Sequence, residues 1–249
     1  MSFMDQFSER SLEYARARPG YPPALFSALA GLAPGGELAW DAGTGNGQAA
    51  IGLARHFIKV LATDASAAQL AEARADARVT YRQAREGESG LPSRSADLIT
   101  VAQAAHWFDL DAFYVEAFQV LRPGGVLALW CYGLCQITPE IDAVMKRFYT
   151  KTLSPWWPPE RRHVEAGYRT LSFPLPELSF PQAEMLHRWT LTEVIDYVGT
   201  WSAVAGYRKG RGADPLPPLA EDLRALWGEP DTRREVRWPL HGRIGRLER

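Results

Sequence analysis

Residues Trp40–Ala50 read WDAGTGNGQAA and place three glycines within five positions. The short apolar segment ELAW leads into this stretch, and a pattern typical of a helix follows over residues 47–57. A glycine-rich turn between a strand and a helix lets the backbone come close to a bound phosphate or nucleotide. The stretch therefore predicts a site for a nucleotide-like ligand, and its spacing distinguishes between such ligands.

The glycines Gly43, Gly45 and Gly47 follow a G-x-G-x-G pattern, not the G-x-G-x-x-G of dinucleotide loops, and no Lys-Ser or Lys-Thr pair follows as in a P-loop. Asp41 precedes them, and a carboxylate there repels pyrophosphate but suits the cationic end of a ligand. Asp64 ends the next apolar segment, where a carboxylate can accept both hydroxyls of a ribose. These features favour S-adenosylmethionine over NAD.

The first half of the chain alternates between strand-like and helix-like patterns. This alternation predicts a doubly wound, mostly parallel α/β sheet with helices on both faces. The predicted strands lie at 37–40, 58–63, 78–84, 96–102 and 121–130, with a turn at the start of the last one, and the predicted helices lie near 22–34, 47–57, 66–77 and 110–121.

The second half of the chain breaks this rhythm. Residues 138–151 have a helical pattern, and residues 152–182 are dense in proline, aromatic residues and arginine, as expected of a lid or substrate segment inserted after the fifth strand. TLTE at 190–193 predicts a capping box at the start of a helix. A helix near 216–227 and a last strand at 234–241 complete the expected elements.

Composition excludes several classes of protein. The 249 residues carry a net charge of −1, which gives no electrostatic reason to expect nucleic acid as a partner. The two cysteines are spaced Cx3C without a second pair, so neither a disulfide framework nor a metal site is expected. No apolar run approaches the ~20 residues that span a membrane. We therefore expect a cytoplasmic protein with a single domain over residues 1–249.

Four segments, DAGTGNG, TDAS, SADLITVAQAAHWFD and VLRPGGVLALW, together resemble the class I, Rossmann-like S-adenosylmethionine-dependent methyltransferases. More narrowly, they resemble the type 11 small-molecule group that includes trans-aconitate methyltransferase-like proteins. The resemblance implies a seven-stranded sheet of order 3-2-1-4-5-7-6 with strand 7 antiparallel. It also implies a cofactor-binding core over 36–135 and a segment over 1–21 that covers the cofactor.

The resemblance assigns cofactor roles to the glycine loop and its two acids. Gly43, Gly45 and Gly47 would line the methionine and ribose portions, Asp41 would lie near the amino group, and Asp64 would bind the ribose hydroxyls. Two structural alternatives stay open. The glycines could serve only a tight turn, and Asp64 could cap the following helix.

The resemblance extends these roles to five more residues. Ala65 would pack on the adenine and Gln103 would face the methionine portion. Glu86 would meet the adenine edge, although the family often has an Ala-Glu pair where this chain has Glu-Gly-Glu. Tyr14 and Arg18 would cover the cofactor, and Arg18 would pair with its carboxylate. Arg18 as ordinary surface charge is the alternative.

His106 follows the fourth predicted strand, beside the expected methyl group. Methyl transfer from a sulfonium is an in-line displacement, and it needs a general base only if the acceptor arrives protonated. A neutral imidazole could serve as that base for a hydroxyl acceptor. In the alternative, His106 shapes the pocket through hydrogen bonds and takes up no proton.

The acceptor is expected to be a small molecule. Arg161, Arg162 and His163 could bind an anionic group, and the trans-aconitate resemblance suggests a carboxylate that becomes a methyl ester. Trp156 and Trp157 could add apolar walls. The residues that we assign to substrate binding are Tyr21, Trp107, Arg162, Tyr197 and Trp201, each of which could instead be core or surface.

The leading prediction is therefore a methyltransferase that uses S-adenosylmethionine and acts on a small molecule. A cofactor-binding protein without catalysis is one alternative, and a methyltransferase for a macromolecule is another. The sequence has no N-P-P-Y-like motif after the fourth strand, which disfavours the latter. The loop spacing disfavours a dehydrogenase, and the oligomeric state is not predicted.

Overall fold

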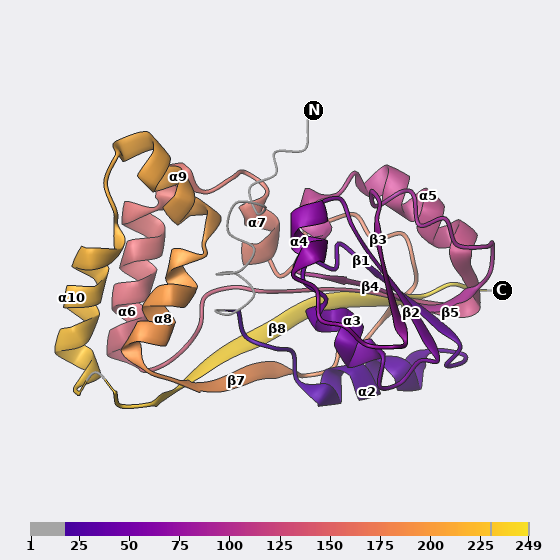
Figure 1. Cartoon of the computed structure of the whole chain (residues 1–249), viewed down its shortest axis with the longest axis horizontal. Helices are drawn as coiled ribbons and strands as arrows, with labels where there is room; N and C mark the ends of the chain where they lie inside the picture. The colour runs from indigo at the N-terminus through magenta and orange to yellow at the C-terminus, as the bar shows by residue number, and fades with distance from the viewer. Residues whose placement is uncertain (1–17, 230, 249) are drawn as a thin grey trace.

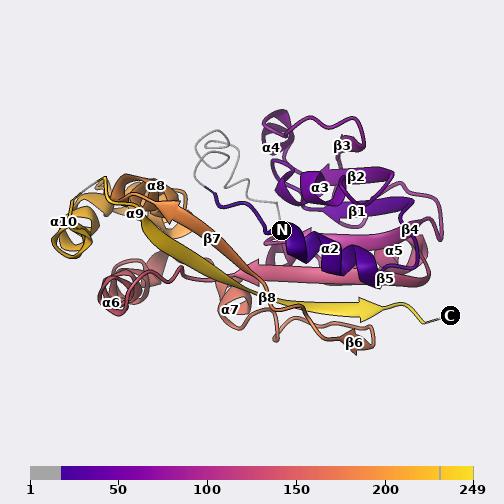
Figure 2. The same ribbon diagram turned by 90° about the horizontal axis from the view of Figure 1, so that it is seen from below.

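The computed structural model describes residues 18–229 and 231–248. Figure 1 shows a sheet flanked by helices at one end of the molecule and a group of helices at the other. Two strands, β7 (Glu184–Trp189) and the longer β8 (Arg234–Arg246), connect the two ends (Figure 2). The predicted covering residue Tyr14 lies outside the described residues.

The sheet has the predicted order and direction. Its strands run β3-β2-β1-β4-β5-β8-β6, with the last long strand antiparallel to β5, which corresponds to the expected 3-2-1-4-5-7-6. An eighth strand, β7, pairs only with β8. The strands are β1 Leu38–Ala42, β2 Lys59–Asp64, β3 Val79–Gln83, β4 Ala96–Ala102, β5 Leu121–Tyr132, β6 Glu177–Leu178, β7 Glu184–Trp189 and β8 Arg234–Arg246.

The length of β8 explains the additional strand. Its second half, Leu240–Arg246, pairs with β5 inside the sheet. Its first half, Arg234–Pro239, continues past the sheet and pairs with β7 instead. The β7–β8 ribbon thus joins the helices at the far end of the molecule to the sheet.

Successive side chains of the central strands are buried on opposite faces of the sheet and form two separate hydrophobic cores. In β5, Val126, Ala128 and Trp130 belong to one cluster, while Leu127 and Leu129 belong to the other. This is the two-residue period of a strand that is covered on both faces. The first cluster packs against helices α2 (Pro23–Leu32) and α3 (Gln48–Leu53), and the second against α5 (Leu110–Val120).

Several predicted boundaries differ from the structure because tertiary contacts override local pattern. The helix expected over 66–77 is α4, Ala67–Ala71, because the backbone of Arg74 donates to the Asn46 carbonyl and accepts from the Tyr81 hydroxyl. The turn expected at residues 121–125 is part of β5, since the pairing with β4 continues across it with a shift in register. Gly124 has a φ of +79° within that irregularity.

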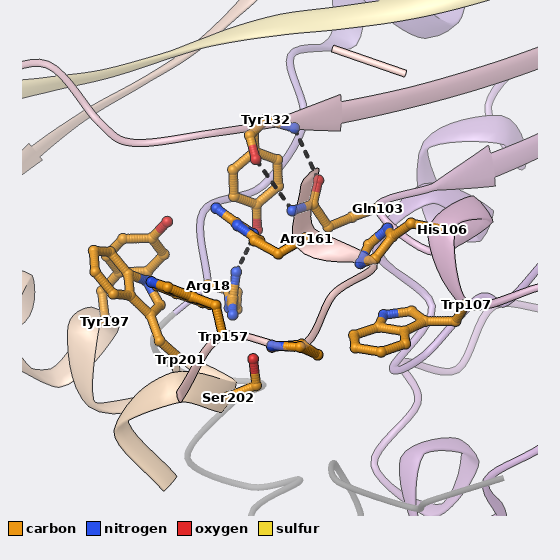
Figure 3. A pocket seen from close by; sticks show the side chains of 11 residues that line it. Arg18, Gln103, His106, Trp107, Tyr132, Trp157, Arg161, Tyr197, Trp201 and Ser202 are labelled. Atoms are coloured by element: carbon orange, nitrogen blue, oxygen red, sulfur yellow. Dashed lines mark hydrogen bonds between the residues drawn. The ribbon is translucent and has the colours of Figure 1, made fainter. Parts of the chain in front are cut away.

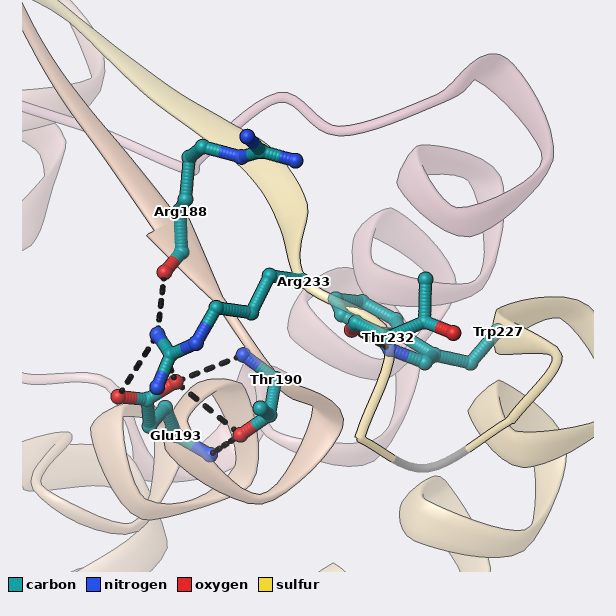
Figure 4. A network of polar contacts seen from close by, with 6 residues as sticks. All are labelled: Arg188, Thr190, Glu193, Trp227, Thr232 and Arg233. Atoms are coloured by element: carbon teal, nitrogen blue, oxygen red, sulfur yellow. Dashed lines mark hydrogen bonds and ion pairs between the residues drawn. The ribbon is translucent and has the colours of Figure 1, made fainter.

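The helical group, which we call the helical unit, consists of α6 (Pro139–Arg147), α8 (Leu191–Gly199), α9 (Ser202–Arg211) and α10 (Leu216–Trp227). The predicted capping box is confirmed: the Thr190 hydroxyl accepts from the Glu193 backbone, and the Glu193 carboxylate accepts from the Thr190 N–H at 2.7 Å. Arg233 joins this helix start to β7 and β8, because it donates to the Arg188 carbonyl at 2.7 Å and pairs with Glu193 at 3.2 Å (Figure 4).

The segment expected to be a lid, residues 152–182, lies between the two ends of the molecule. It contains a short 3-10 turn at Ser154–Trp156, helix α7 (Arg161–Glu165) and strand β6. The Trp156 ring lies close against Gly206 and Gly210 of α9, and β6 pairs with β8. The segment therefore contacts the helical unit with one part and the sheet with another.

Candidate active site

The glycine loop, residues 43–47, connects β1 to α3 at the carboxyl edge of the sheet. Gly43, Gly45 and Gly47 have φ values of +66°, +57° and +83°, a region that residues with a Cβ rarely adopt. A Cβ at Gly43 would lie 2.7 Å from the Ala104 Cβ, and one at Gly47 would lie 2.2 Å from the Tyr81 hydroxyl. Packing within the protein therefore explains two of the glycines.

Gly45 is different, because the nearest atom to its hypothetical Cβ is the Gln69 Oε1 at 3.7 Å. Steric contact within the chain does not require a glycine there. The side of the loop at Gly45 is thus the part that a ligand could approach closely.

Asp41 lies beneath the loop and is fully buried. Its two oxygens accept hydrogen bonds from the Thr44 hydroxyl at 2.6 Å and the Thr100 hydroxyl at 2.7 Å. Burial raises the pKa of this carboxyl to about 6, and the two hydroxyls oppose the shift. In this structure Asp41 therefore holds the loop to β4.

Asp64 ends β2 beside the loop. Its Oδ2 accepts from the Gly45 N–H at 2.8 Å, and its Oδ1 accepts from the Ser66 N–H at 2.8 Å. Ser66, and not Asp64, is the N-cap of α4, since its hydroxyl accepts from the Gln69 N–H. Each oxygen of a carboxylate can accept a second hydrogen bond, so Asp64 can also receive ribose hydroxyls.

The other predicted cofactor residues have clear structural partners. Glu86 accepts from the Asp109 N–H at 2.8 Å and so holds the start of α5, and the Ala65 carbonyl accepts from Gln83. Gln103 exchanges two hydrogen bonds with the Tyr132 backbone, at 3.1 and 2.8 Å, and has a φ of +58°. This strained backbone keeps the Gln103 side chain at the ends of β4 and β5.

A pocket opens between these strand ends and the helical unit (Figure 3). In the figure, His106 and Trp107 lie on one side, and Tyr197 and Trp201 lie on the other. The lining residues come from both ends of the molecule and from the predicted lid; they are Arg18, Gln103, His106, Trp107, Tyr132, Trp157, Pro158, Arg161, Tyr197, Trp201 and Ser202.

Two guanidinium groups face this pocket. Arg161 donates from Nε to the Tyr149 hydroxyl at 2.8 Å, and its guanidinium carbon lies 4.9 Å from the centre of the Trp157 ring. Arg18 donates to the Tyr132 hydroxyl at 2.9 Å and lies over the Tyr197 ring. No acidic side chain is among the lining residues in the part of the chain that the structure describes. The charged side chains of the described lining are therefore all basic.

Sequence reasoning assigned Arg162 to the acceptor, but the structure has Arg161 in the pocket and Arg162 exposed. Consecutive residues of a helix point about 100° apart, so only one of the two can face the pocket from α7. The Arg162 side chain contacts His163 instead. The sequence offered both arginines without a signal that distinguished them.

His106 lies in a short 3-10 turn after β4 and is 8% exposed. Its Nδ1 is 2.9 Å from the hydroxyl of the fully buried Tyr168, and its ring packs against Trp107 at 4.7 Å between centroids. Burial lowers the pKa of His106 to about 3, with further contributions from Arg161 and His163. The imidazole is therefore neutral at ordinary pH and is a weak base.

Of the predicted aromatic residues, Tyr197 and Trp201 line the pocket and are buried. Tyr21 is not among the lining residues, because its ring packs edge-on against Trp130 in the core, at 5.4 Å between centroids. Sequence reasoning missed Tyr132, although its position at the carboxyl end of β5 is a general signal for ligand contact. Ser202 and Tyr168 carried no comparable signal.

Comparison with known proteins identifies the family. A family model described as a methyltransferase domain matches residues 40–129. A Dictyostelium discoideum protein named "putative methyltransferase" is 35% identical over 225 residues, which cover 89% of this chain and 86% of that protein. The chain belongs to the methyltransferases. Their Rossmann-like fold and dependence on S-adenosylmethionine agree with the sheet order and the loop described above.

A solved structure supports this assignment over nearly the whole chain of the methyltransferase. The "putative type II methyltransferase" from Anaeromyxobacter dehalogenans shares 49% identity with a TM-score of 0.87 and covers 93% of this chain and 98% of its own. A Saccharomyces cerevisiae protein named "probable S-adenosylmethionine-dependent methyltransferase" is 30% identical, but the match covers 52% of this chain and 46% of that protein. The resemblance to the trans-aconitate subgroup is not confirmed by these comparisons.

The residues present in the methyltransferase fit the cofactor. Steric contact within the described chain leaves room beside Gly45, and the Asp64 carboxylate at the end of β2 is the kind of group that binds ribose hydroxyls. Within residues 18–229 and 231–248, no cluster of His, Cys, Asp and Glu could hold a metal ion, and no helix is long and apolar enough to span a membrane.

Proposed function

We propose that this methyltransferase transfers the methyl group of S-adenosylmethionine to the carboxylate of a small molecule. The observation that carries the proposal is the guanidinium group of Arg161 in a pocket whose described lining contains no acid. An anionic acceptor would gain charge-assisted hydrogen bonds there, whereas a cationic one would be repelled.

The setting of Arg161 supports the proposal further. Its Nε donates to the Tyr149 hydroxyl, which itself donates to Glu165 at 2.7 Å. The guanidinium carbon lies 5.6 Å from the centre of the Tyr149 ring and 4.9 Å from that of the Trp157 ring. The structure has no hydrogen bond from the two terminal nitrogens of Arg161 to any described residue. These nitrogens match the two oxygens of a carboxylate.

The aromatic walls of the pocket suit an acceptor with an apolar body. Trp107, Trp157, Tyr197 and Trp201 surround the polar centre. The segment over 152–182 would act as the substrate segment, since it supplies Trp157, Pro158 and Arg161. The resemblance to trans-aconitate methyltransferase-like proteins agrees with a carboxylate acceptor.

The chemistry of this reaction does not require a base. S-adenosylmethionine supplies an electrophilic methyl group: a carboxylate oxygen forms the new C–O bond as the C–S bond breaks, and the electron pair stays on sulfur. No proton moves, so a neutral His106 with a pKa of about 3 is sufficient. The protein contributes orientation and exclusion of water, which are the main sources of rate in such a displacement.

The test is a screen of the wild-type protein with S-adenosylmethionine labelled in the methyl group. Acceptors are offered as pairs, an aromatic or aliphatic carboxylate beside its primary amide. We expect label in the carboxylates and not in the amides, as a methyl ester that mild base hydrolyses. Transfer to phenols or amines with no carboxylate product would refute the proposal, and so would S-adenosylhomocysteine binding without transfer to any carboxylate.

A further inference from the structure

Tyr168 lies outside the pocket but contacts a residue that lines it. It follows α7, is fully buried, and has a φ of +62° directly after Gly167 at +60°. A left-handed conformation is unfavourable for a residue with a Cβ, and such strain persists where packing enforces it, often near functional sites. This backbone directs the phenol toward the turn that carries His106.

The Tyr168 hydroxyl has a single hydrogen-bond acceptor among the described residues. It is 2.9 Å from the His106 Nδ1, and no other acceptor for it occurs among the described residues. The backbone N–H groups of Ala105 and His106 interact with the same oxygen and can only donate to it. A fully buried hydroxyl donates a hydrogen bond wherever an acceptor is in reach, so the phenol donates to Nδ1.

This direction of donation determines the tautomer of the imidazole. A neutral imidazole whose Nδ1 accepts a hydrogen bond carries its proton on Nε2. The Nε2 atom of His106 has no hydrogen bond to any described residue, and it is not among the fully buried polar atoms without a partner. It is thus accessible at the pocket that His106 lines.

We propose that Tyr168 is a positioning residue that holds His106 as the Nε2–H tautomer, so that His106 donates a hydrogen bond to the acceptor and takes no proton from it. This inference rests on the proposed function for the identity of the acceptor. With an anionic acceptor, His106 and Arg161 would hold the carboxylate by donation only. Substrates then have to arrive already ionised, and neutral hydroxyl compounds are poor acceptors.

The surroundings of His106 agree with a donor. Arg161 and His163 face it from α7, and both disfavour a positive charge on the imidazole. Trp107 covers one side of the ring. A second proton on this ring is therefore unfavourable while the acceptor site is empty.

The first experiment reads the tautomer directly and needs no acceptor. The full-length protein, saturated with S-adenosylhomocysteine, is labelled with ¹⁵N in its five histidines, and the His106 signals are assigned by their absence in His106→Gln. We expect a protonated Nε2 and an unprotonated Nδ1 in the wild type. Tyr168→Phe should give a mixture of tautomers or the reverse one.

Tyr114→Phe is the matched control. Tyr114 and Tyr168 belong to the same buried cluster, and the Tyr114 hydroxyl donates to the Ser172 carbonyl at 2.6 Å, away from His106. Each variant loses one buried phenol hydroxyl with its hydrogen bond, so a general loss of stability should affect both. A change in the His106 tautomer and in the rate should occur only in Tyr168→Phe.

The second experiment measures kcat/KM with the best carboxylate from the acceptor screen. Without Tyr168, the hydrogen bond from His106 to the acceptor carboxylate should be misaligned, and the loss of such a bond predicts a fall in kcat/KM of about 10-fold in Tyr168→Phe. Tyr114→Phe should lower kcat/KM by less than about 2-fold. His106→Gln, which keeps a donor, should retain more activity than His106→Leu.

Two results would overturn the inference: an Nδ1–H tautomer in the wild type, or equal loss of activity in the two Tyr→Phe variants. If no carboxylate is methylated, the proposed function fails, and the tautomer measurement still decides the assignment of His106.

Discussion

The cofactor edge of the sheet, residues 41–47 and Asp64, is built differently from the pocket. The cofactor edge consists of one loop and one strand end, and only 17 positions in the sequence separate Gly47 from Asp64. The pocket gathers its lining from five separate segments, between Arg18 and Ser202. The first can be recognised as a pattern in the sequence, whereas the second exists only once the helical unit packs beside the sheet.

The two regions also carry charged side chains of opposite sign. The cofactor edge contains acids, Asp41 and Asp64, that hold threonine hydroxyls and backbone N–H groups. The pocket contains guanidinium groups that are supported by tyrosine hydroxyls and aromatic rings. This difference agrees with a cationic donor on one side and an anionic acceptor on the other, so variants of the two regions should separate cofactor binding from acceptor turnover.

The largest expected effect concerns Asp64. Asp64→Ala removes a carboxylate that can bind two hydroxyls, and charge-assisted hydrogen bonds of this kind contribute about 1.5–3 kcal/mol each. We therefore expect the affinity for S-adenosylhomocysteine, measured by calorimetric titration, to fall by at least about 100-fold.

The control for Asp64→Ala is Asp76→Ala. Asp76 also accepts from the backbone, at the Arg78 N–H, but it lies away from the loop. The Asp76→Ala protein should bind S-adenosylhomocysteine with the same affinity as the wild type. An Asp64→Ala protein that melts like the wild type and still binds at full affinity would show that the cofactor edge is misassigned.

A smaller expected effect is that His106 of the pocket and Asp41 of the cofactor edge change the free energy of unfolding in opposite directions as the pH falls. Burial lowers the pKa of His106 from 6.5 to about 3, so the unfolded chain takes up the proton first and folding loses stability as pH falls below 6.5. Burial raises the pKa of Asp41 from 3.8 to about 6, so the folded chain takes up the proton first and folding gains stability as pH falls below 6. Between about pH 7.5 and about pH 5 the two changes are about 2 and about 1 kcal/mol, with opposite signs.

Urea unfolding of the wild type, His106→Gln and Asp41→Asn at these two pH values measures both effects. On acidification, the wild type should lose stability relative to His106→Gln and gain stability relative to Asp41→Asn. Shifts of the same sign in the two comparisons would contradict the account of at least one of these buried groups.

The sequence predicted what local pattern controls. The alternation of strands and helices predicted a doubly wound, mostly parallel sheet, and the family resemblance implied its strand order. TLTE predicted the start of α8 because a capping box is a contact between neighbours in the chain. The sequence did not predict β7, which depends on β8 continuing beyond the sheet. It also chose Arg162 over Arg161, because the rotation of α7 is set by packing and not by its own residues.

The most direct test of the central claim compares Arg161→Gln with Arg162→Gln, two neighbouring arginines of which one faces the pocket and the other faces water. Initial rates are measured with a carboxylate acceptor at saturating S-adenosylmethionine, together with the affinity for S-adenosylhomocysteine. We expect Arg161→Gln to lower kcat/KM by about 10-fold to 100-fold at unchanged cofactor affinity, and Arg162→Gln to stay within about 2-fold of the wild type. Equal rates in the two variants, or a loss explained by weaker cofactor binding, would contradict an acceptor carboxylate held by Arg161.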